Sequence, residues 1–85
     1  MKASLDQLKP GERGTVCWIA LPAERAQSLT RLGLCPGTEI LCLRRTPLGD
    51  PRVYRFLGTD VAIRQKDAAG IKVRIDRGQP EIETS

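Results

Sequence analysis

The chain has 85 residues, of which 40% are hydrophobic and 28% charged, with a net charge of +4 and no histidine. This length suits one compact domain, and so small a core leaves no room for a large ligand cavity or an elaborate catalytic cleft. No apolar run approaches the roughly 20 residues that a membrane-crossing helix needs, and no signal-peptide pattern follows Met1, so we expect a cytoplasmic domain.

The first half of the chain predicts a turn, a strand and a helix. A short apolar-spaced turn at residues 5–8 ends at Pro10-Gly11, and residues 15–21 are apolar and rich in β-branched side chains, as a strand is. A helix is predicted for residues 22–32, because Pro22 suits a first helical turn and Gly33 suits a helix end. Its apolar face is expected to pack against the domain through Ala26, Leu29 and Leu32.

The second half predicts mainly strands. They cover residues 38–45, 52–57, 61–64 and 71–75, with a tight connection at 46–51, a hairpin turn at 58–60 and a helical turn at 66–69. Five short strands with one helix favour a small barrel. The expected core consists of Val16, Ile40, Cys42, Tyr54, Phe56, Val61, Ile63, Ile71 and Val73.

Several motifs stand in a fixed order along this pattern. They are Leu5-x-x-Leu8-x-x-Gly11, Leu32-Gly33-Leu34-Cys35-Pro36-Gly37, Pro47-Leu48-Gly49-Asp50-Pro51, Ile63-Arg64 and Ala68-x-x-Ile71-x-Val73. Together they resemble the FeoA family, the small ferrous iron transport protein A, over residues 4–75. One departure is Arg52, which stands where the family strand has an aliphatic residue, and we expect its stem to pack while its charged end stays in water.

The resemblance implies a mainly β, SH3-like barrel of about five antiparallel strands, with one short α-helix inserted after the first strand. It would span residues 1–75, leaving residues 76–85 as a polar tail that we expect to be disordered. The implied function is that of a cytoplasmic accessory protein in bacterial ferrous iron uptake, without enzymatic activity or a cofactor. Its partner would be the cytoplasmic domain of a membrane Fe(II) transporter that carries a G-domain, of the FeoB type. Whether it would stimulate GTP hydrolysis or assemble the transporter stays open, as do weak self-association and recruitment to the inner face of the membrane.

The stiff loop at residues 47–51 is the predicted partner-binding surface. Two prolines fix its shape before binding, which lowers the ordering cost of association. Leu48 would be either an apolar anchor for a partner or a plug for the end of the barrel. The full hypothetical surface comprises Pro47, Leu48, Gly49, Asp50 and Pro51 with the surrounding Arg44, Arg45, Arg52 and Arg55.

The same residues are compatible with other functions. A second-half surface rich in arginine and lysine could track phosphates, and Tyr54 and Phe56 could stack bases if they were exposed; their alternation on an apolar strand favours the core instead. A regulatory module related to the C-terminal domain of iron-dependent repressors is a further alternative. No metal site is assigned: the cysteines at 17, 35 and 42 lack zinc-site spacing, and Asp50, Asp60, Asp67 and Asp76 are scattered.

Overall fold

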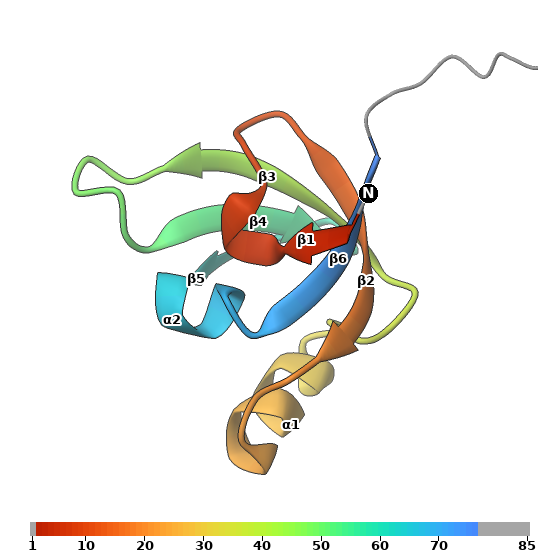
Figure 1. Cartoon of the computed structure of the whole chain (residues 1–85). Coiled ribbons are helices and arrows are strands. Elements are labelled where there is room, and N and C mark those ends of the chain that lie inside the picture. Colours follow the sequence, from red (N-terminus) through yellow and green to blue (C-terminus); the bar gives the residue numbers. More distant parts are fainter. Residues whose placement is uncertain (1, 77–85) are drawn as a thin grey trace, which may run out of the picture.

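The computed structural model describes residues 2–76, which form one antiparallel sheet with two short helices (Figure 1). The elements are β1 (Lys2–Ser4), the 3₁₀ turn η1 (Leu5–Gln7), β2 (Arg13–Ile19), α1 (Ala23–Arg31), β3 (Glu39–Arg45), β4 (Arg52–Phe56), β5 (Thr59–Ile63), α2 (Gln65–Ala68) and β6 (Ile71–Asp76). Their order across the sheet is β1-β6-β2-β3-β4-β5. The mainly β prediction is confirmed, with one strand more than the five expected, because β1 is too short to show alternation.

The end of α1 differs from the prediction. Ala26 and Leu29 are half-buried as expected, but Leu32 is 51% exposed. The chain leaves the helix through Gly33, whose φ of 102° is in the left-handed region, and the Leu34 amide then donates to the Leu29 carbonyl at 3.0 Å. This reversal brings Leu34 into the core in place of Leu32.

The β4–β5 hairpin turns earlier than the predicted 58–60. Leu57 and Gly58 form a two-residue turn and both have positive φ values, 53° and 74°. Two residues of this kind match the right-handed twist of the flanking strands. Thr59 is therefore the first residue of β5 and not part of the turn.

Eight of the nine predicted core side chains are buried, and Val61 is half-buried against them. The core also takes in five residues that were not predicted for it: Leu5, Leu8, Leu34, Ala68 and Ile75. Their burial shows that the turn before β2 and the end of β6 belong to the packed interior.

The sheet is not closed by strand pairing, because β1 and β5 are its two outer strands. The turn η1 fills the gap between them. Arg52 donates from Nη1 to the Asp6 carbonyl and, at 3.1 Å, to the Leu8 carbonyl, while the Tyr54 hydroxyl donates to Leu5 O at 3.4 Å. The guanidinium of Arg52 therefore points into the body of the domain and not into water as predicted. These contacts link β4 to η1 across the opening.

Candidate docking surface

The loop between β3 and β4 extends beyond the rest of the sheet (Figure 1). Its tip is a turn in which the Gly49 amide donates to the Thr46 carbonyl at 2.8 Å. Pro47 occupies the second position of this turn, where its fixed φ is favourable, and Gly49 has a φ of 84°. The residue types that predicted a stiff connection therefore form one.

Leu48 stands at the tip with 93% of its surface exposed, the highest value among the large hydrophobic residues of the described chain. It does not plug the end of the barrel, which was one of the two roles open to it. Pro47 beside it is also exposed. The loop thus presents an apolar side chain to solvent on a turn held by its own backbone.

Asp50 fixes the base of this loop. Its carboxylate Oδ1 accepts a hydrogen bond from the Gln65 backbone amide at 2.8 Å, at the first residue of α2. The amide has no partner within its own helix, so the carboxylate satisfies a free donor. Asp50 follows Gly49 and precedes Pro51, which is half-buried and joined through a cis peptide bond. The carboxylate that the sequence placed on the partner surface therefore has an internal role, which no local signal indicated.

The four predicted arginines do not form one rim. Arg44 is exposed near the loop, whereas Arg52 binds the carbonyls of η1. Arg55 binds Asp60 through Nε–Oδ1 at 2.7 Å, and this hydrogen bond lowers the pKa of Asp60. Arg45 pairs with Arg52 in the β3–β4 ladder, and its side chain lies outside the described part of the structure.

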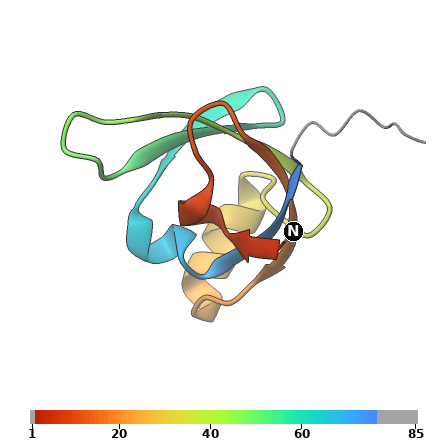
Figure 2. The ribbon, with the colours of Figure 1, turned by 45° about the horizontal axis from the view of Figure 1, so that its top comes forward.

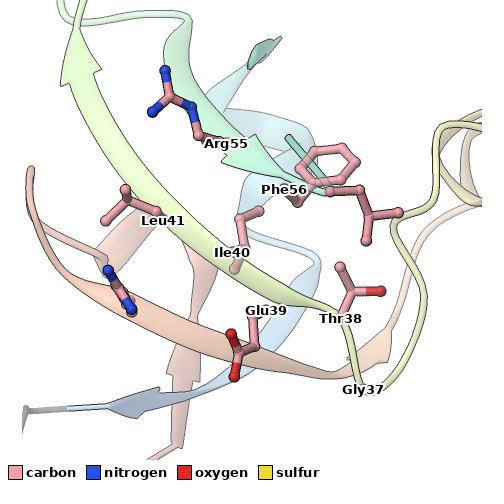
Figure 3. A pocket seen from close by; sticks show the side chains of 9 residues that line it. Gly37, Thr38, Glu39, Ile40, Leu41, Arg55 and Phe56 are labelled. Atoms are coloured by element: carbon pink, nitrogen blue, oxygen red, sulfur yellow. The ribbon is translucent and has the colours of Figure 1, made fainter. Parts of the chain in front are cut away.

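Two shallow hollows lie on the outer side of the sheet. One of about 460 Å³ lies over β3, where Leu41 and Arg55 stand opposite each other on neighbouring strands (Figure 3). Leu57 lines it from the turn at the far end of β4, away from the β3–β4 loop. The other, of about 620 Å³, lies beside β1, β2 and β6 and is lined by Trp18 and Lys72.

The aromatic and thiol side chains are placed mainly by packing. Tyr54 and Phe56 are buried, so neither is available to stack a base. Cys42 is buried, and Cys17 and Cys35 are half-buried. Among the side chains that the structure describes, no three Cys, Asp or Glu residues come together as a group that could hold a metal ion.

Comparison with solved structures gives close relatives of the whole domain. FeoA from Chlorobium tepidum is 34% identical with a TM-score of 0.82, over 96% of this chain and 81% of that chain. FeoA from Stenotrophomonas maltophilia, solved with zinc and described as a prokaryotic SH3 domain protein, is 25% identical with a TM-score of 0.73. That match covers 87% of this chain and 95% of that chain. The SH3-like fold predicted from the sequence is thus confirmed.

A manganese-dependent transcriptional repressor has the same fold at 18% identity, with a TM-score of 0.77 over 86% of this chain and 41% of that chain. This likeness concerns the fold alone. No curated protein sequence matches the chain. Neither of the two α-helices in residues 2–76 has the length and apolar character required to span a bilayer. The FeoA domain family matches residues 3–75, and the chain therefore belongs to the FeoA family.

Proposed function

We propose that this chain is a cytoplasmic, non-enzymatic accessory protein of ferrous iron uptake that binds the cytoplasmic G-domain of a membrane Fe(II) transporter of the FeoB type. Membership of the FeoA family supports the role in ferrous iron transport. The observation that carries the choice of surface is Leu48, an almost fully exposed leucine at the tip of a projecting loop. The docking tip is defined as Pro47, Leu48 and Gly49.

The docking tip needs little ordering when it binds. The Gly49–Thr46 hydrogen bond holds the turn, and the Asp50–Gln65 hydrogen bond ties its base to α2. A partner therefore meets an apolar side chain whose backbone is already in place, and the entropy lost on association is small. Leu48 would fill an apolar pocket on the G-domain, as the central residue of an interface does.

Electrostatic attraction has a smaller part in this proposal than the sequence suggested. Arg52 and Arg55 are engaged within the domain, which leaves Arg44 as the described exposed arginine beside the docking tip. A single rim charge alters mainly the rate of encounter and its dependence on salt. We therefore expect the affinity to depend on Leu48 far more than on ionic strength.

The test is a binding measurement with the purified G-domain in its GTP-analogue, GDP and nucleotide-free states. Leu48→Asp should weaken binding by roughly thirtyfold or more, the loss typical of a central interface residue, whereas Leu48→Met should bind normally. The matched control is Leu57→Asp, which places the same charge at an exposed leucine at the opposite end of β4. Asp tolerates the positive φ of that position.

The variants should also be compared in cells that depend on this protein for ferrous iron uptake. Loss of uptake with Leu48→Asp, together with an unchanged melting temperature, supports the docking tip. Full binding and uptake by folded Leu48→Asp would refute it and direct attention to the exposed side of α1. Equal losses with Leu57→Asp would show that the effect is not specific to the tip.

A further inference from the structure

Four basic side chains gather on the outer face of the sheet where β1, β6 and β2 lie side by side. Lys2, Arg74 and Thr15 are direct neighbours across these three strands. Lys72 and Arg13 lie two residues from Arg74 and Thr15, so they share that face. The alternate β6 residues at 71, 73 and 75 are buried beneath it. We name Lys2, Arg13, Lys72 and Arg74 the basic sheet face.

Among the side chains that the structure describes, no acidic group forms an ion pair with the basic sheet face. Lys2 stands directly opposite Arg74, and like charges in this position destabilise a sheet. Lys72 Nζ donates to the Ala69 carbonyl at 3.1 Å, and Asp76 stands opposite Arg13 in the β2–β6 ladder, so the excess of positive charge is greatest around Lys2, Lys72 and Arg74. Glu39, opposite Thr15, bounds the face on its far side. An anionic surface would relieve this repulsion.

An exposed tryptophan adjoins the same face. Trp18 pairs with Lys72, immediately after a shift in the β2–β6 register, and is 61% exposed. It lines the hollow of about 620 Å³ together with Lys2, Ser4 and Lys72. It is also the only tryptophan of the chain. Indole rings flanked by lysine and arginine are characteristic of surfaces that lie in the headgroup layer of a bilayer.

We propose that the basic sheet face and Trp18 bind the surface of an anionic lipid bilayer, with the indole in the headgroup layer. Charge complementarity selects an anionic occupant, and the single exposed indole favours lipid over nucleic acid. A nucleic-acid surface would need further stacking aromatics, and Tyr54 and Phe56 are buried. The β3–β4 loop and the strands β1, β6 and β2 lie on opposite sides of the molecule in both views, so the docking tip and the basic sheet face can act at the same time (Figures 1 and 2).

Trp18 makes the proposal directly measurable in the unmodified protein. Vesicles of phosphatidylcholine with phosphatidylglycerol should shift its fluorescence to shorter wavelength, and pure phosphatidylcholine should not. The shift should decrease as the ionic strength rises, because salt screens exposed charges. In vesicle co-sedimentation, Lys2→Gln with Arg74→Gln should lower the partition coefficient roughly fivefold for each charge removed.

The matched control is Arg64→Gln with Lys66→Gln, which removes two exposed charges at the start of α2. It has the same net charge as the double variant Lys2→Gln with Arg74→Gln. It should bind vesicles within about twofold of the wild type, since charges beyond a Debye length from the bilayer are screened. Leu48→Asp should bind vesicles normally, which separates this proposal from that of the docking tip. Circular dichroism establishes that each variant is folded.

Three results would overturn the assignment. One is the absence of any fluorescence shift or sedimentation with anionic vesicles at low ionic strength. Another is an equal loss in the two double variants, which would reduce the effect to net charge. The third is binding of the wild type to an oligonucleotide but not to vesicles, which would assign the face to nucleic acid.

Discussion

Alkaline pH should destabilise this domain through Tyr54, its only tyrosine. The side chain is buried, and desolvation by burial raises its pKa from the ordinary 10.0 of a tyrosine to about 12. The folded state therefore holds the phenolic proton more tightly than the unfolded state. The resulting stability is fully present below about pH 10 and is lost as the pH rises towards 12.

The size of the effect follows from the shift in pKa. Two pH units correspond to about 2.7 kcal/mol of unfolding free energy, of which about half is lost by pH 11. Tyr54→Phe removes this titration together with the hydrogen bond to Leu5 O, which contributes about 0.5–1 kcal/mol at neutral pH. The wild type should thus be the more stable protein at pH 8, and the order should reverse near about pH 10.5.

Urea unfolding of both proteins between pH 8 and pH 11 provides the assay. All other ionisable groups are present in both proteins, so the difference in stability isolates Tyr54 together with its electrostatic interaction with Cys42. The absorbance of tyrosinate measures the pH at which half of Tyr54 is ionised. This pH should be well above that of the unfolded protein in urea when it is measured in the native wild type. A native midpoint equal to that in urea, or a stability difference that does not change with pH, would refute the reasoning.

Three substitutions test other contacts by chemical denaturation. Gly33→Ala should cost about 1–2 kcal/mol because of the positive φ at this position. The added Cβ would also meet the exposed Leu57 side chain, which can move aside, so a further Leu57→Ala should restore little of the lost stability. Asp50→Ala should cost about 1 kcal/mol and speed hydrogen exchange at the Gln65 amide above all others. Arg52→Met should cost about 1–3 kcal/mol because two carbonyls around η1 lose their donor. An unchanged midpoint in any of these would contradict the role assigned to that contact.

Sequence reasoning recovered the features that arise from neighbours in the chain. Alternation predicted β6, and the Pro and Gly positions predicted the ends of α1 and the stiff loop that exposes Leu48. It missed contacts between distant segments, such as the Asp50–Gln65 hydrogen bond across 15 residues and the Arg52–Asp6 contact across 46. These depend on which strands pair, and the local pattern does not contain that information.

The same distinction between neighbours in the chain and contacts between distant segments applies to the candidate surfaces. The arginines around the loop are close in sequence but separate in space, since Arg52 shares the inward face of β4 with Tyr54 while Arg55 points outward. The alternation of β4 already implied this separation. The basic sheet face had no such signal, because Lys2 and Arg74 become neighbours only when β1 pairs with β6.

The position of β6 between β1 and β2 has a consequence for synthesis of the chain. The strands β3, β4 and β5 form successive hairpins and can pair as soon as they leave the ribosome. By contrast, β1 pairs only with β6, and β2 pairs with β6 as well as with β3. Strand β6 is the last strand of the described chain. The edges that β1 and β2 present to β6, together with the apolar residues Leu5 and Val16, remain incompletely covered until translation has passed residue 76. A nascent chain that stalls before this point would carry a formed hairpin and an N-terminal segment that other proteins, chaperones included, can bind.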